Sequence, residues 1–146
     1  MYTALPNRPD WQSLLKSGNR IFLGSHAAVP NALLDDLIAN AQGLHDIEIV
    51  HILTLSDHRW VDPKLNELFK VNTLFIGGDK MRAAVSEGRA DYTPCFLSEV
   101  PSLFETDILP LDAALIMVSP PDKFGYCSLG VSVDVVQAAV RKARYV

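Results

Sequence analysis

The 146-residue sequence predicts an α/β domain with a mainly parallel sheet flanked by helices. Short apolar runs of β type alternate along the chain with stretches of helical periodicity, which is typical of βαβ units. No internal repeat, low-complexity tract or Gly/Ser linker divides the chain, so residues 1–146 are expected to form a single domain. With 49% hydrophobic and 21% charged residues, the composition is that of a globular protein with its own core.

Apolar patterns predict the elements of the first half. A short helix is expected at 11–16, followed by a strand at 20–24 that ends in a Gly/Ser/His turn. Pro30 suits the first turn of the next helix, which Gly43 ends. Residues 47–55 predict a strand that is apolar on both sides and therefore covered on both. The polar stretch 56–67 predicts a long surface excursion.

Shorter elements are expected in the second half. A strand at 71–76 leads through a Gly77-Gly78 turn into a helix at 81–87, and a brief strand follows at 90–96. An irregular helix is expected at 97–104, then a buried strand at 112–118, and a helix at 132–143. The closing pair Tyr145-Val146 resembles the start of another strand.

Charge and composition argue against several classes of partner. A net charge of −4 gives the chain no positive field for nucleic acid. Residues 1–11 contain no apolar segment of signal-peptide length, and the run 113–118 is too short to cross a membrane. The two cysteines form no CxxC pair, so neither a disulfide framework nor a zinc ribbon is indicated. We therefore expect a reduced, cytoplasmic protein without membrane attachment.

The histidines do not predict a metal site. His45, His51 and His58 have no HExxH spacing and no cysteine partner, so no metal is expected. His51 is interpreted as a hydrogen-bonded core or cleft residue. The sequence also contains no GxSxG, GxxxxGK[ST] or GxGxxG motif, which argues against a nucleophile elbow or a nucleotide site.

Three loops, at 24–30, 77–79 and 119–130, each connect a predicted strand to a predicted helix. Ligands of parallel sheets gather at such positions, beyond the carboxyl ends of the strands. In the first loop, His26 stands beside a helix start among small residues that leave room for a ligand. Its neutral ring is expected to donate a hydrogen bond to an acyl or carboxylate oxygen, while a surface or capping histidine is the alternative.

The third loop is the strongest candidate because its twelve residues exceed the usual length of such connections. Gly125 and Gly130 permit positive φ, and Tyr126 and Ser128 supply hydroxyl groups. A structural loop that merely closes the core is the alternative interpretation. Cys127 has no obvious base beside it in the sequence and is expected to be a small buried thiol rather than a nucleophile.

Several segments of the chain form a recognisable set: residues 18–24, 26–30, 75–94 and 96–101, and above all the SPPD and GYCSLGVSVD motifs at 119–122 and 125–134. Together they resemble the N-terminal domain of the acetyl-CoA hydrolase/transferase family, which includes acetate, succinate and 4-hydroxybutyrate CoA-transferases. The resemblance covers nearly the whole chain. It implies the α/β CoA-transferase fold and an enzyme of two domains with the active site between them.

The resemblance also implies a ping-pong reaction through a glutamyl-CoA thioester. The nucleophilic glutamate and the Gly-rich CoA loops of the family belong to the C-terminal half, which this sequence lacks. No glutamate of the chain matches that motif, so no catalytic residue is assigned here and the chain alone is expected to be inactive. Coenzyme A thioester is expected as a substrate, with no bound cofactor.

The N-terminal half is expected to contribute the substrate side of the cleft, in which the turns of His26 and Tyr126 line one crevice. The expected substrate-binding residues are Gly24, His26, Pro30, Ser119, Pro120, Gly125, Tyr126, Cys127, Ser128 and Gly130. The expected partners are acyl-CoA, a short-chain carboxylate, the absent C-terminal domain and further copies of the chain, since an unfinished sheet favours association.

Two other hypotheses remain. One is a non-catalytic binding or assembly module that keeps the fold. A sugar-phosphate isomerase of related architecture is disfavoured, because no phosphate-cradling loop with an adjacent lysine is present.

Overall fold

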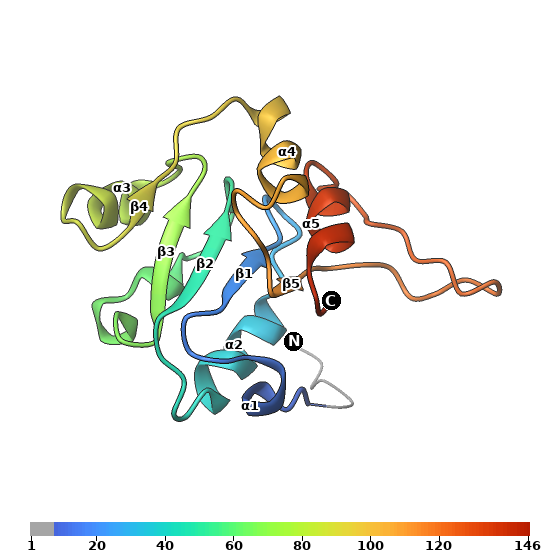
Figure 1. The fold of residues 1–146 in the computed structure, drawn as a ribbon, viewed down its shortest axis with the longest axis horizontal. Coiled ribbons are helices and arrows are strands. Elements are labelled where there is room, and N and C mark those ends of the chain that lie inside the picture. Colours follow the sequence, from blue (N-terminus) through green and yellow to red (C-terminus); the bar gives the residue numbers. More distant parts are fainter. Residues whose placement is uncertain (1–7) are drawn as a thin grey trace.

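A computed structural model describes residues 8–146 and contains one five-stranded, all-parallel sheet in the order β4-β3-β2-β1-β5. Figure 1 shows the sheet with helices on both faces. Residues 1–7, where no targeting segment is expected, lie outside the described part. The elements are α1 (Trp11–Leu14), β1 (Arg20–Leu23), α2 (Asn31–Asn40), β2 (Ile47–His51), η1 (Arg59–Val61), η2 (Pro63–Leu65), β3 (Phe69–Thr73), α3 (Asp79–Ser86), β4 (Asp91–Tyr92), η3 (Leu97–Glu99), α4 (Val100–Glu105), β5 (Ala113–Leu115) and α5 (Val136–Lys142).

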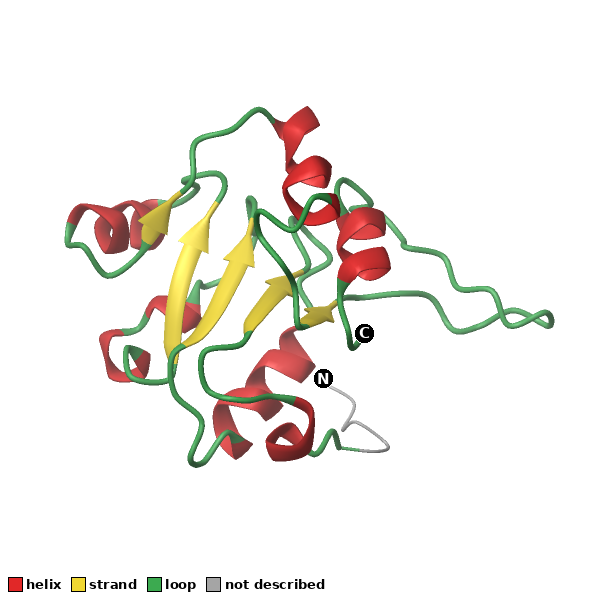
Figure 2. Ribbon diagram, in the orientation of Figure 1, coloured by secondary structure: helices red, strands yellow, loops and turns green. Residues whose placement is uncertain are grey.

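Two apolar clusters, one on each face of the sheet, form the core. On β1, Ile21 and Leu23 pack with α1, α2 and α3, whereas Phe22 points to the other face and packs with α4 and α5. Its ring meets Phe104 edge-on, with the centroids 5.7 Å apart. The same alternation on β2 confirms that this strand is covered on both sides. The predicted α/β class is confirmed, and Figure 2 shows helices on either side of the strands.

Most predicted strands exist, but they are shorter than their apolar runs. β2 ends at His51 and β5 at Leu115, although apolar residues continue beyond each, because the chain there leaves the sheet to build loops. β3 begins at Phe69 rather than at residue 71, since its exposed Lys70 interrupts the apolar pattern without interrupting the pairing with Glu48. Strand ends are thus set by pairing rather than by hydrophobicity.

Two predictions about loops and helix ends are wrong. The final helix starts at Val136 rather than at 132, because Asp134 has a φ of +25° and cannot belong to a right-handed helix. The stretch 56–67 is not wholly a surface excursion. It contains the turns η1 and η2 and buries Trp60, which is 1% exposed in the core, together with most of His58.

The last residues extend the sheet beside β5. Tyr145 pairs in parallel with Ala113, its N–H donating to the carbonyl of Asp112 and its carbonyl accepting from the N–H of Ala114. The start of another strand, expected from the sequence, is therefore present as a single bridge. No described helix, within residues 8–146, is long and apolar enough to span a membrane.

Candidate functional site

The loops that follow β1 and β2 run side by side beyond the carboxyl edge of the sheet. The N–H of His26 donates to the carbonyl of Leu53 over 2.6 Å, and the carbonyl of His26 accepts from the N–H of Leu55 over 3.0 Å. These bonds form a parallel bridge between His26 and Thr54, and His26 adopts a φ of +52°. The backbone therefore fixes where the imidazole stands.

Gly24 and Pro30 shape this turn from both ends. A Cβ on Gly24 would lie 2.9 Å from the carbonyl oxygen of Ala28 and 3.3 Å from that of Leu115, so only glycine fits between the two backbones. Pro30 is buried and caps the start of α2. Both residues hold the turn in place, which gives them a structural role next to the predicted binding role.

A small apolar cavity of about 150 Å³ opens beside His26. Its walls come from the ends of β2 and β3 and from the segment that leads into α4. They are Ile52, Leu53, Leu74, Phe75, Cys95, Leu97 and Val100. Burial, and next the charge of Glu99, raise the pKa of the Cys95 thiol, which disfavours a nucleophilic thiolate there. The cavity is suited to an apolar group next to one imidazole.

His26 faces a carboxylate that lies far away in the sequence. Its Nδ1 atom is 3.2 Å from Oδ2 of Asp134, and the side chains of His26 and Asp134 are 38% and 11% exposed. The other oxygen of Asp134, Oδ1, accepts from the N–H of Val135. Sequence reasoning missed this pairing, although Asp134 ends the GVSVD motif that it singled out.

The predicted loop 119–130 is an arm of two antiparallel segments. The N–H of Ser119 donates to the carbonyl of Ser128, and the N–H of Asp122 to the carbonyl of Tyr126, each over 2.9 Å. At the tip, Oδ1 of Asp122 accepts from the N–H groups of Phe124 and Tyr126. Figure 1 shows this arm projecting beyond α5 and away from the sheet.

The arm contributes nothing to the cavity of His26 within residues 8–146, so the expectation that the two turns line one crevice of this chain is wrong. Only the root of the arm reaches the site, through Asp134. The tip side chains Phe124 and Tyr126 are 72% and 75% exposed. Cys127 is exposed as well, so the expectation of a buried thiol is also wrong.

The predicted loop 77–79 lies against the same region from the side of β3. A Cβ on Gly77 would collide with Leu53, a wall of the cavity, and one on Gly78 would lie 3.2 Å from the ring of His58. Gly78 has a φ of +77°, which also favours glycine. This loop therefore packs closely against one wall residue of the cavity, Leu53, and against His58.

Behind the cavity, β2 buries an imidazole without a hydrogen bond. His51 is 1% exposed, neither of its ring nitrogens has a partner, and its ring meets Trp60 edge-on with the centroids 5.5 Å apart. The expectation of a hydrogen-bonded histidine is wrong. Burial, and next the neighbouring His58, lower the pKa of His51 to about 3. His58 bonds through Nε2 to Thr54, and burial lowers its pKa too.

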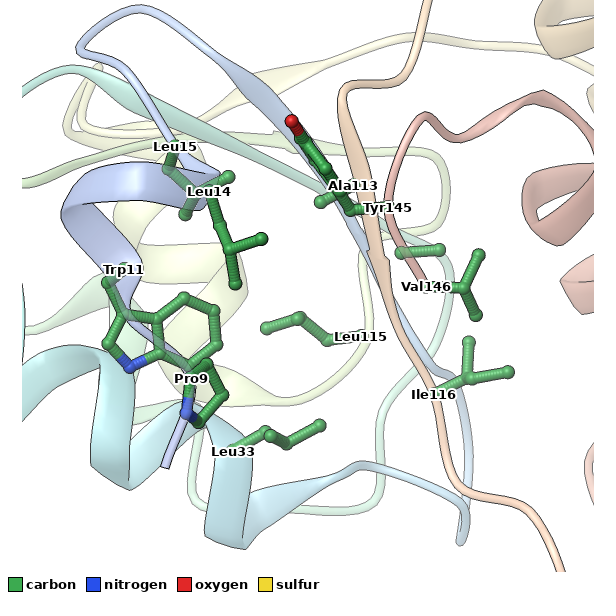
Figure 3. Close-up of a pocket in the computed structure, with 11 residues that line it drawn as sticks. Pro9, Trp11, Leu14, Leu15, Leu33, Ala113, Leu115, Ile116, Tyr145 and Val146 are labelled. Carbon is green, nitrogen blue, oxygen red and sulfur yellow. The ribbon is translucent and has the colours of Figure 1, made fainter. Parts of the chain in front are cut away.

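The described molecule has further cavities, of which one of about 420 Å³ is lined by charged side chains that include Arg59, Lys80 and Arg89. An apolar cavity of about 230 Å³ lies beside β5 and is lined by Trp11, Leu33, Leu115 and Ile116 among others (Figure 3). Among the residues that line this apolar cavity, Tyr145 has a titratable side chain, its phenol hydroxyl. None of the others has a carboxyl, imidazole, amine or thiol side chain. In residues 8–146 no cluster of three His, Cys, Asp or Glu side chains is arranged to hold a metal ion.

Comparison with solved structures identifies the class of this fold as an α/β domain of the kind found in CoA-transferases. A structure of RipA from Yersinia pestis superposes with a TM-score of 0.78 at 25% identity over 94% of this chain and 37% of that one. A 4-hydroxybutyrate CoA-transferase from Porphyromonas gingivalis gives a TM-score of 0.68 at 29% identity over 90% of this chain and 29% of that one.

Sequence relatives agree with this class. A succinyl-CoA:acetate/propanoyl-CoA:succinate CoA transferase from Fasciola hepatica is 42% identical over 99% of this chain and 32% of its own length. The 4-hydroxybutyrate coenzyme A transferase of Clostridium kluyveri is also 42% identical, over 92% of this chain and 31% of its own.

Residues 5–146 match the family described as acetyl-CoA hydrolase/transferase N-terminal domain, and the chain belongs to that family. It spans about a third of the length of these curated relatives.

Proposed function

We propose that this chain forms the substrate side of an enzyme that transfers CoA between a short-chain acyl-CoA and a free carboxylate, of the acetate or 4-hydroxybutyrate type. The observation that carries the proposal is the apolar cavity beside His26, at the carboxyl edge of the sheet, in a chain of this family. An apolar cavity of about 150 Å³ is the size that accepts a small hydrocarbon group. The acyl group enters it, and the carbonyl carbon stays near the imidazole.

The proposed reaction is ping-pong and uses a glutamate outside this chain. Its carboxylate attacks the thioester carbonyl, and CoA leaves as the thiolate. The thiolate then attacks the glutamyl carbonyl of the resulting anhydride and displaces the acyl group as its carboxylate, leaving a glutamyl-CoA thioester. A second carboxylate reverses both steps. Water must be kept out of the site, since it hydrolyses either intermediate.

The arm is proposed to complete the site from the other side. Its residues Ser119, Pro120, Gly125, Tyr126, Cys127, Ser128 and Gly130 remain predicted substrate-binding residues. Support comes from the exposed aromatic tip, which Asp122 holds in shape through two amide bonds. Large exposed apolar groups in an ordered segment are typical of contact surfaces. The remaining two thirds of the enzyme would cover this tip and bring the glutamate to it.

A turnover assay tests the proposed function. The chain is incubated with acetyl-CoA and butyrate, alone and together with the C-terminal two thirds of the Clostridium kluyveri relative. We expect butyryl-CoA only when both parts are present, because the nucleophile lies outside residues 1–146. Turnover by the isolated chain would contradict the proposal, and the intact relative serves as the positive control.

A non-catalytic assembly module is the second candidate, and the exposed tip of the arm favours it equally. Isothermal titration calorimetry and sedimentation distinguish the two. Binding of butyryl-CoA by the chain supports the enzyme, whereas a defined oligomer that binds neither acyl-CoA nor carboxylate supports the module.

A further inference from the structure

We infer that Asp134 is a positioning residue that fixes the proton of His26 on Nδ1 and so leaves Nε2 of the same ring to face the substrate. The inference starts from the pairing of Nδ1 with Oδ2 of Asp134 over 3.2 Å. It deepens the proposed function, on which it rests for the identity of the ligand, although the position of the proton does not depend on that ligand.

The location of the proton follows from what a carboxylate can do. An ionised carboxylate only accepts hydrogen bonds, so a nitrogen at bonding distance from it must carry the proton. A bare Nδ1 would instead place two lone pairs face to face. His26 is therefore either neutral with a bare Nε2, or doubly protonated and paired with Asp134. A neutral ring in this contact has no second N–H to donate to an acyl or carboxylate oxygen, which is the role that the sequence predicts for His26.

The environment of Asp134 makes the orientation specific. Its side chain is 11% exposed, and its second oxygen is occupied by the N–H of Val135. The carboxylate therefore cannot rotate freely, and Oδ2 stays on the imidazole. Both residues also hold positive φ angles, +52° for His26 and +25° for Asp134, so the backbone presents the two side chains to each other.

The consequence concerns how the site treats a carboxylate or a thiol. A bare Nε2 accepts the proton of an incoming acid, and the ring that results is a cation stabilised by Asp134. That cation donates from Nε2 to the oxygen of the carboxylate left behind. Among residues 8–146, Nε2 of His26 has no hydrogen-bond partner in the protein, so it is free for this role.

The same contact joins the arm to the cavity. Asp134 lies at the root of the arm, whereas His26 lines the cavity, and the two are 108 positions apart in the sequence. The pairing is the point at which the GVSVD segment meets the substrate site. This gives that segment a role which its exposed position alone does not explain.

The test is the protonation pattern of His26, read from long-range ¹H–¹⁵N spectra of the chain labelled on histidine, at a pH where imidazoles are neutral. His26→Gln assigns the signals. In the unaltered chain we expect the Nδ1–H tautomer. In Asp134→Asn, the amide oxygen keeps the bond to Val135 and the NH₂ group faces Nδ1, so the tautomer should invert to Nε2–H. Asparagine also tolerates positive φ, which keeps the backbone in place.

A matched control comes from His45 and Asp46, whose pair is 2.8 Å apart but 64% and 49% exposed. Asp46→Asn should leave the signals of His26 unchanged. An Nε2–H tautomer in the unaltered chain would overturn the inference, and so would an Nδ1–H tautomer in Asp134→Asn while the other histidine signals show a folded chain.

Adding butyrate then distinguishes the proposed ligand of the site from the positioning role of Asp134. In the unaltered chain the bound butyrate anion should stabilise a second proton, taken from the solvent, on Nε2 of His26, and in Asp134→Asn this change should be lost. A correct tautomer together with no response to butyrate refutes the proposed ligand but not the role of Asp134. In the reconstituted enzyme, Asp134→Asn should lower kcat/KM about 10- to 100-fold, by analogy with the loss of a carboxylate that orients a metal-bound imidazole.

Discussion

His51 shows how a single buried side chain links the stability of the domain to pH. Its two ring nitrogens have no partners, and burial holds its pKa at about 3, below the ordinary value of 6.5. Above pH 6.5 the ring is neutral in both the folded and the unfolded chain. Between pH 6.5 and 3 only the unfolded chain binds the proton, so the free energy of unfolding falls as the pH falls.

We therefore predict that His51→Leu removes much of the pH dependence of stability. Below pH 6.5 the unaltered chain should lose up to about 1.4 kcal/mol per pH unit from this group. Leucine cannot titrate and leaves no unpaired nitrogen, so the variant should be at least as stable at pH 7.5. Urea unfolding at pH 7.5 and 5.0 measures this. His45→Gln, an exposed control, should keep the original slope, and an equally steep slope in His51→Leu would refute the explanation.

Residues with local signals could be predicted from the sequence, and residues defined by distant contacts could not. His26 was identified because it follows a strand and a glycine, which places it at the carboxyl edge of a parallel sheet. Asp134 was missed because its partner is 108 residues away. Leu97 and Val100 line the cavity but resemble ordinary core residues. Nothing in the spacing of apolar residues distinguishes the wall of a pocket from a filled core.

At the scale of helices and strands, the existence of an element is also easier to predict from the sequence than its ends. Although it does not predict η1 and η2, the sequence predicts all five strands and the α-helices, because alternating periodicity reflects burial on two faces of a sheet. Their ends were misplaced where the chain leaves the sheet but stays apolar, as after β5. The arm was recognised as an unusually long connection, yet its direction depends on hydrogen bonds such as that between Ser119 and Ser128, which no local pattern encodes.

The arm depends on Asp122, and we predict that Asp122→Ala loosens the tip alone. Oδ1 of Asp122 accepts from the N–H groups of Phe124 and Tyr126, over 2.8 and 2.9 Å. Amide hydrogen exchange at these two residues should become faster, while the midpoint of urea unfolding stays the same, because the tip packs on neither core cluster. Lys123→Ala, whose side chain bonds to no tip amide, is the control. Unchanged exchange at Tyr126 would show that the carboxylate does not hold the tip.

For the molecule as a whole, the two faces of the sheet are closed while the carboxyl edge is left for contact. Helices cover both core clusters, and the arm projects beyond α5 (Figure 1). The aromatic side chains of its tip are exposed to solvent. The chain also spans about a third of the length of its relatives. In the function proposed above, this domain receives the acyl group and another part of the enzyme supplies the carboxylate nucleophile.

Entry of the acyl group into the cavity of His26 is tested most directly by titrating the methyl-labelled chain with butyryl-CoA and following its NMR signals. We expect saturable shifts at Leu97 and Val100. Cys95→Phe, which fills the cavity, should abolish them, and Ile108→Phe, at an exposed position that does not line the cavity, should leave them intact. Equal shifts in Cys95→Phe, or shifts confined to Leu33 and Leu115 beside β5, would contradict the account.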